Sequence, residues 1–175
     1  SLPTHLVDDI SDLLGHDKVF AKSGLTLGHF SWTPPEEMFS ELIQTIVSQQ
    51  VSTAAARSMV KRLREQVGPL TLKNIKKQSD DDLRACGMSR PKISYLRGLV
   101  NAIEAKEFHP ESLYDCDDTE VANRITALKG FGPWSAQMIL MFTLARPDIW
   151  PAGDLGICSG VQFYKRTAER PDIPA

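Results

Sequence analysis

The segment from Leu128 to Ala136, Leu-Lys-Gly-Phe-Gly-Pro-Trp-Ser-Ala, has the composition of a tight hairpin that exposes backbone N–H groups. Gly130 suits the left-handed residue that ends a helix, and Pro133 suits the first turn of a helix, where its missing N–H costs nothing. Consecutive N–H groups at a helix N-terminus form a site for a phosphate oxygen. A carboxylate, Asp154, follows 18 residues after Ala136. An isolated glycine turn is more often a plain connector, so the downstream carboxylate is what favours a chemical role.

Both flanks of this hairpin carry apolar residues at a helical spacing. These residues are Val121, Ile125 and Leu128 before the hairpin and Ala136, Ile139, Leu140 and Leu144 after it, with Thr143 on the same face. We therefore predict one helix from Val121 to Leu128 and a second helix beginning near Pro133.

The remaining chain has the pattern of helices and loops. Apolar stripes predict two amphipathic helices, one through Leu6, Ile10, Leu13 and Leu14 and one through Met38, Phe39, Leu42, Ile43, Ile46 and Val47. A third helix is expected from a Ser52 cap through Arg64, and further caps are expected at Thr71, Ser79, Ser89 and the acidic run 117–120. Only the segment Ser23 to Thr33 alternates in a way that suits a short strand.

Three segments in this order and at these separations resemble a known family. They are Ile-Val-Ser-Gln-Gln-Val-Ser at 46–52, Gly-Met-Ser-Arg-Pro-Lys-Ile-Ser-Tyr-Leu at 87–96, and the hairpin with Asp154. The chain resembles the helix-hairpin-helix DNA glycosylases, and within them the alkylpurine branch of 3-methyladenine DNA glycosylase II, from about Phe30 to Tyr164.

The resemblance implies an all-α fold in which two helical bundles flank an active-site cleft. Residues 1–175 are then one domain, with a central bundle of about residues 34–130 and a second bundle formed by the N- and C-terminal helices. Relatives continue into a further aromatic and basic segment after the helix that carries the catalytic aspartate, so the C-terminal end is expected to be short.

The resemblance assigns the catalytic carboxylate to Asp154. Cleavage of a base from deoxyribose passes through an oxocarbenium-like sugar, whose charge a fixed carboxylate stabilises while it orients or deprotonates water. The alternative is that Asp154 only caps the helix that starts near Leu155, a role worth about 1 kcal/mol. Both roles are compatible.

Trp134 indicates the reaction subtype. Relatives that also cut the DNA backbone carry a lysine at this hairpin position, since an amine is needed to form a Schiff base with the sugar. We therefore expect a monofunctional hydrolase that excises alkylated purines such as 3-methyladenine and 7-methylguanine, whose positive charge suits an indole face. Met138, Trp32 and Phe30 are expected to line the base pocket with Trp134, although core packing explains each of them as well.

The expected DNA contacts lie in all three segments. A flipped base leaves a gap in the duplex, and Gln50 occupies the position that fills it in the family, with Gln49 supporting the loop. Gly130, Phe131 and Gly132 are expected to hold a phosphate, and Lys92 to lie near another. No metal site made of side chains and no cofactor is expected, except a Na⁺ or K⁺ ion held by hairpin carbonyl groups.

Composition limits these readings. The chain of 175 residues has the size of one domain, a net charge of −2 and no apolar run that approaches 18 residues. Its start lacks the features of a signal peptide, and three separate cysteines suit a reducing compartment. We therefore expect an intracellular monomer, in a nucleus or in a bacterial cytoplasm or nucleoid, without membrane contact.

Charge distribution supports double-stranded DNA containing damaged bases as the partner. Between Arg57 and Arg97 there are 11 Lys or Arg against 4 Asp or Glu, so one face of the molecule is expected to be basic. Two alternatives remain open on the sequence alone. One is a glycosylase for neutral deaminated or etheno purines, and the other is a non-catalytic helix-hairpin-helix DNA-binding module.

Overall fold

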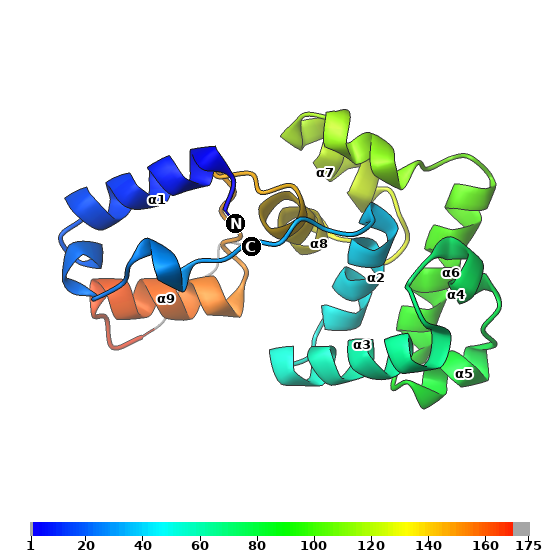
Figure 1. The fold of residues 1–175 in the computed structure, drawn as a ribbon. Helices are drawn as coiled ribbons and strands as arrows, with labels where there is room; N and C mark the ends of the chain where they lie inside the picture. The colour runs from blue at the N-terminus through cyan, green and yellow to red at the C-terminus, as the bar shows by residue number, and fades with distance from the viewer. Residues whose placement is uncertain (1, 170–175) are drawn as a thin grey trace. The chain divides into compact units, whose positions relative to one another are not determined.

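The protein is all helical over residues 2–169, the part of the chain described by the structure, a computed structural model (Figure 1). The elements are α1 Thr4–His16, η1 Phe20–Lys22, η2 Leu27–His29, α2 Met38–Ser48, α3 Thr53–Val67, α4 Leu72–Lys76, α5 Asp80–Ala85, α6 Arg90–Glu104, η3 Pro110–Asp115, α7 Asp118–Thr126, α8 Pro133–Met138, η4 Ile139–Thr143 and α9 Leu155–Lys165. The all-α prediction is confirmed. The strand considered for 23–33 is wrong, because the short helix η2 lies there.

Two compact units divide the chain. The smaller unit joins the N-terminal segment up to Pro34 with the segment from Ala145 onward, and the larger unit is Pro35–Leu144. The larger unit therefore extends beyond residue 130, the limit expected from the sequence, and includes α8 and η4. The hairpin belongs to the larger unit and Asp154 to the smaller one.

Helix α2 forms the centre of the larger unit. Met38, Leu42, Ile43 and Ile46 are fully buried, and α2 contacts α3, α6, α8, η3 and η4. Burial of such side chains contributes about 1.5–3 kcal/mol each relative to exposure. The loop that leaves the C-terminus of α2 is therefore attached to the most firmly packed helix of this unit.

Helix caps follow the local sequence signals in four of five cases. The side chains of Ser52, Thr71, Ser79 and Asp117 each accept a backbone N–H bond at the start of a helix. Ser89 stands at the N-terminus of α6 but makes no such bond. The four observed caps each accept from the third residue of the helix, which in α6 is Lys92, so Pro91 at the second position does not explain the missing bond.

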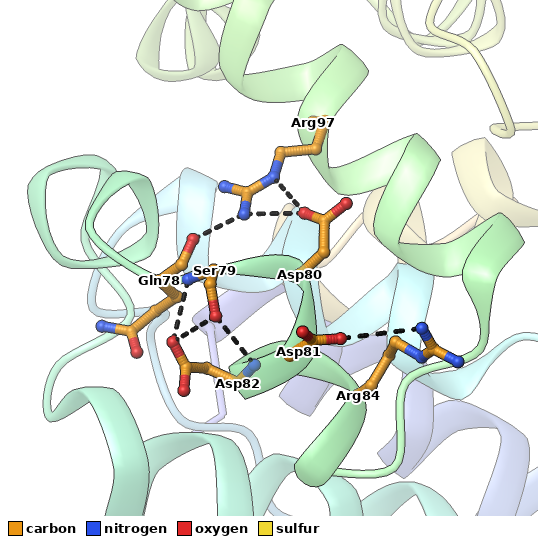
Figure 2. A network of polar contacts seen from close by, with 7 residues as sticks. All are labelled: Gln78, Ser79, Asp80, Asp81, Asp82, Arg84 and Arg97. Carbon is orange, nitrogen blue, oxygen red and sulfur yellow. Dashed lines mark hydrogen bonds and ion pairs between the residues drawn. The ribbon is translucent and has the colours of Figure 1, made fainter.

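A polar network ties α5 to α6 (Figure 2). Arg97 donates to the Asp80 carboxylate at 2.9 Å and to the Gln78 carbonyl at 2.5 Å. Ser79 and Asp82 cap the start of α5 reciprocally, and the hydroxyl and backbone N–H of Ser79 lower the pKa of Asp82. These contacts fix the turn that precedes α5 against the side of α6.

Part of the basic surplus of residues 57–97 is paired, and two of the acids, Glu36 and Glu104, lie outside the segment. Ion pairs join Lys61 to Glu65, Arg64 to Glu36, Lys76 to Glu104, Arg84 to Asp81 and Arg97 to Asp80. Exposed pairs of this kind neutralise charge while adding little stability. The simple count therefore overstates the charge that this segment offers to DNA.

The smaller unit is held together by contacts between the two ends of the chain. His5 Nε2 lies 2.9 Å from the Ala145 carbonyl, and the Tyr164 hydroxyl donates to Asp17 at 2.7 Å. The ring centroids of Phe20 and Tyr164 lie 5.7 Å apart.

None of the helices within residues 2–169 combines the length and the apolar character that a membrane span requires.

Candidate active site

The hairpin is a turn that follows the end of α7 and is not a direct continuation of that helix. Helix α7 confirms the helix predicted before the hairpin, but it ends at Thr126, two residues before Leu128. The Phe131 N–H donates to the Leu128 carbonyl at 3.1 Å, and Gly130 in this turn has a φ of +85°. A positive φ at this place in a turn favours glycine, which has no Cβ atom to clash with the backbone. Gly130 therefore has the left-handed conformation predicted from the sequence.

Tyr95 explains why a side chain is excluded at Gly130. A Cβ atom added to Gly130 would lie 2.1 Å from Cγ of Tyr95, a residue of α6. The aromatic ring therefore packs directly against the glycine backbone. The sequence placed Tyr95 in a family segment without indicating this contact.

The second half of the hairpin begins α8. Gly132 precedes the helix, Pro133 is its first residue, as predicted, and Phe131 is buried. Trp134 is half-buried in the first turn, and Met138 is half-buried one turn later. The chain then continues through η4, a π-helical turn in which the Leu144 N–H donates to the Ile139 carbonyl at 2.9 Å.

Gln49 connects the loop after α2 with the hairpin. Its Nε2 donates to the Gly130 carbonyl at 2.9 Å and to Ser135 Oγ at 3.2 Å. The supporting role expected for Gln49 therefore consists of a bridge to the hairpin backbone. The next residue, Gln50, is exposed and has a φ of +54°, which is uncommon for a residue other than glycine.

Lys92 does not lie where a phosphate contact requires. The side chain is 8% exposed, and its Nζ donates to the Val47 carbonyl at 2.6 Å. Burial lowers the pKa of Lys92. The expected DNA contact is therefore corrected, because the ammonium group is directed at the end of α2 inside the larger unit.

Asp154 caps α9. Its Oδ1 accepts hydrogen bonds from the N–H groups of Gly156 at 2.8 Å and Ile157 at 3.1 Å. The cap predicted as an alternative is thus present. Two hydrogen bonds fix the preceding turn. The Asp154 N–H donates to the Pro151 carbonyl at 2.9 Å, and the Cys158 thiol donates to the Ala152 carbonyl at 3.2 Å.

Gly156 leaves room for this carboxylate. A Cβ atom on Gly156 would lie 2.9 Å from Asp154 Oδ1, closer than real Cβ atoms approach an oxygen. A glycine two residues after a capping aspartate was the available sequence signal, and it was missed. Gly156 therefore belongs to the residues that determine where the carboxylate lies.

Two of the three aromatic residues expected in the base pocket, Phe30 and Trp32, belong to the same unit as Asp154. Phe30, directly after η2, is 37% exposed, and Trp32 is half-buried. Nearby His29 accepts the Thr26 N–H on Nδ1 at 3.0 Å and so serves as a local cap. Their contact with a base stays a prediction.

Among the side chains of residues 2–169, no group of three or more His, Cys, Asp or Glu residues is placed to hold a metal ion. The hairpin offers carbonyl oxygens. Those of Leu128 and Gly130 already accept one hydrogen bond each, and a carbonyl oxygen has a second lone pair. This donor set fits Na⁺ or K⁺, which stays a prediction.

Comparison with known proteins identifies the family. A family model described as HhH-GPD superfamily base excision DNA repair protein matches residues 43–172. The chain belongs to this superfamily. The chain is 33% identical over 143 residues to DNA-3-methyladenine glycosylase 1 of Schizosaccharomyces pombe, covering 79% of this chain and 61% of the relative. It is 32% identical to DNA-3-methyladenine glycosylase of Saccharomyces cerevisiae, covering 79% of this chain and 49% of the relative.

Solved structures agree with this assignment. The 3-methyladenine DNA glycosylase of S. pombe in complex with abasic DNA matches this chain with a TM-score of 0.79 and 28% identity, covering 92% of this chain and 82% of the other. A DNA-3-methyladenine glycosidase from Bacillus halodurans matches with a TM-score of 0.72 and 28% identity, covering 92% and 75%. The predicted resemblance to the alkylpurine branch is confirmed. The chain spans about half to three fifths of the length of the two curated relatives.

Proposed function

We propose that this chain is a monofunctional DNA glycosylase of base excision repair, which hydrolyses the N-glycosidic bond of alkylated purines flipped out of duplex DNA. The observation that carries the proposal is the Asp154 carboxylate, fixed by two backbone N–H groups at the start of α9. The names of the relatives support the substrate class. The protein is proposed to act as a monomer in the cellular compartment that contains the DNA.

Asp154 supplies the negative charge that the reaction needs. As the bond between C1′ and the base breaks, positive charge develops on the sugar, and a carboxylate already fixed in place stabilises it without reorganising. Water then adds to C1′ and gives its proton to the carboxylate. The products are the free base and an abasic site.

The leaving group requires little help from the protein. An N-alkylated purine such as 3-methyladenine carries a positive charge and departs as a neutral base, so no strong general acid is needed. A tryptophan face attracts a cation by about 0.5–2 kcal/mol. Trp134 is proposed to contact the base in this way, with Met138 beside it one turn later in the same unit.

A strand-cutting step is excluded from the proposal because Trp134 takes the place of an amine. The hairpin does contain Lys129, whose Nζ donates to Ser94 Oγ at 3.0 Å. This lysine precedes the tryptophan position by five residues, and its contact with α6 holds it beside the turn. Lys129 is suited to a phosphate contact, along with Gly130, Phe131 and Gly132.

Base release from methylated duplex DNA tests the proposal. The parent chain is compared with Asp154→Asn, whose amide oxygen can still cap α9, and with Asp148→Asn as a control for an exposed acid of the same unit. We expect release by the parent and the control, a loss of about 10²–10³-fold in Asp154→Asn, and strand breaks only after alkali. Undiminished release by Asp154→Asn contradicts the assignment.

One observation favours a second candidate, a DNA-binding module without catalysis. The chain spans only 49–61% of the length of the two curated relatives, so the activity in their names is a proposal for this chain, and binding by the hairpin alone is the simpler function. Salt-sensitive binding to duplex DNA without release of any base supports this candidate. Release of etheno or deaminated purines in place of alkylated ones shows instead that the enzyme takes neutral lesions.

A further inference from the structure

We propose that Lys92 is a positioning residue that fixes the loop carrying Gln50, by holding the C-terminal end of α2 with its ammonium group. The inference rests on the proposed function for its consequence in repair. The structural part of the inference is that Lys92 holds the loop 48–52 in place, which we call the tie. This tie can be tested without measuring catalysis.

The contact has the geometry of a strong, charge-assisted hydrogen bond. Nζ of Lys92 lies 2.6 Å from the carbonyl oxygen of Val47, the penultimate residue of α2. Carbonyl groups in the last turn of a helix lack intrahelical partners and carry partial negative charge. A buried cation at this point therefore satisfies a backbone group directly before the loop begins.

Burying a lysine at a core position is energetically unfavourable, because its charge loses contact with water. Lys92 lies in the first turn of α6, followed by the buried Ile93. An apolar side chain of similar volume at such a site is often neutral or stabilising, because the cation must give up its water. The stability of the fold therefore does not explain a lysine at this position. The hydrogen bond from Lys92 to the Val47 carbonyl does.

The loop needs such a tie because Gln50 at its tip has an unfavourable backbone conformation. Gln50 has a φ of +54°, a conformation that a glutamine keeps only when its surroundings impose it. The loop is held at three points: Lys92 at Val47, Gln49 on Gly130 and Ser135, and the Ser52 cap of α3. Between them Gln50 is exposed and held in one backbone conformation, which lowers the entropy cost of inserting it into DNA.

Hydrogen–deuterium exchange tests the tie directly. The parent is compared with Lys92→Met, which has nearly the same length without charge, and with Lys61→Met, an exposed lysine of α3. We expect peptides covering residues 47–52 to exchange about tenfold faster or more in Lys92→Met, with no change over α4 and α5 and none in Lys61→Met. Unchanged exchange at 47–52 overturns the inference. Should Lys92→Met fail to fold, Lys92→Gln, which is too short to reach Val47, replaces it with the same expectation.

A second readout connects the loop to DNA. Duplex DNA with an abasic-site analogue opposite 2-aminopurine reports insertion by a change in fluorescence. We expect Lys92→Met to lose most of this signal while it binds undamaged DNA as the parent does, and single-turnover base release to fall about tenfold. Normal insertion by Lys92→Met overturns the inference even if exchange rises. A parent without base release contradicts the proposed function only, since exchange and insertion still decide the role of Lys92.

Discussion

The side-chain amide of Gln49 donates to the carbonyl oxygen of Gly130 at 2.9 Å, across 81 residues of sequence. The same amide reaches Ser135 Oγ in the first turn of α8. The loop that bears Gln50 and the hairpin proposed to hold the DNA backbone are therefore joined by one side chain. A shift of either segment displaces the other.

Gln49→Ala should separate the two segments. The buried Ser135 hydroxyl loses the Gln49 donor and the Gly130 carbonyl loses its side-chain donor, so we expect the free energy of unfolding to fall by about 1–3 kcal/mol. Affinity for DNA with an abasic-site analogue should fall about tenfold. Urea denaturation and fluorescence anisotropy measure the two effects. Gln66→Ala, an exposed glutamine of α3, is the matched control and should change neither.

Gly130→Ala should be among the most destabilising single-methyl additions in the larger unit. A non-glycine residue at positive φ costs about 1–3 kcal/mol, and the new Cβ would meet the Tyr95 ring at 2.1 Å. We expect a loss of about 2–4 kcal/mol by urea denaturation. At Gly132 a Cβ meets nothing within 4 Å and φ is −104°, so Gly132→Ala should stay within about 0.5 kcal/mol. Equal effects at the two positions would refute the explanation through Tyr95.

Gly156→Ala should impair catalysis through the position of Asp154. The added methyl group lies 2.9 Å from Oδ1, so the carboxylate must rotate or withdraw. Because small misplacements of a catalytic group are costly, we expect the single-turnover rate to fall about tenfold to a hundredfold. In Gly160→Ala, on the same helix, the methyl group meets nothing within 4 Å. That variant should keep its rate and gain about 0.5–1 kcal/mol of stability, and a parental rate in Gly156→Ala would count against Asp154 as the catalytic group.

Alkaline pH should reveal the buried charge of Lys92. Its pKa is lowered by burial from an ordinary value of 10.5, so just below pH 10.5 the unfolded chain binds more protons than the native one and native stability rises with pH. Burial raises the pKa of the Cys86 and Cys116 thiols, which acts in the opposite direction above their ordinary value of 9.0. The difference between the parent and Lys92→Met isolates the lysine.

We therefore expect the parent to gain stability relative to Lys92→Met as the pH rises from neutral to 10.5, measured by urea denaturation at each pH. At neutral pH the buried Lys92 is charged, and its desolvation costs free energy. The parent should therefore have a lower free energy of unfolding than Lys92→Met at that pH. A difference that does not vary with pH would mean that Lys92 is not buried in its charged form.

Local signals predicted what local chemistry determines. The caps at Ser52, Thr71, Ser79 and Asp117, the left-handed Gly130 and the cap by Asp154 each depend on a few neighbouring residues, and the structure has all of them. The exception is Ser89, which makes no cap bond at the start of α6. The hydrophobic spacing likewise located α1 and α2.

Long-range contacts could not be predicted in this way. Lys92 looks like an ordinary surface lysine in the sequence, and only the packing of α6 against α2 turns its ammonium group inward. The packing of Tyr95 on Gly130 and the bond from Gln49 to Ser135 are equally invisible to a local pattern. These residues are far apart in the chain, and one sequence carries no record of which of them meet.

The Tyr95 ring against Gly130 also has a consequence for the order of folding. The turn depends on a ring from α6 and on the Gln49 amide from the end of α2, so residues 128–136 alone lack the contacts that shape them. Closing such distant loops is slow compared with forming single helices. We therefore expect a nascent chain to form this hairpin late, and a peptide of residues 128–136 to bind DNA much more weakly than the folded protein.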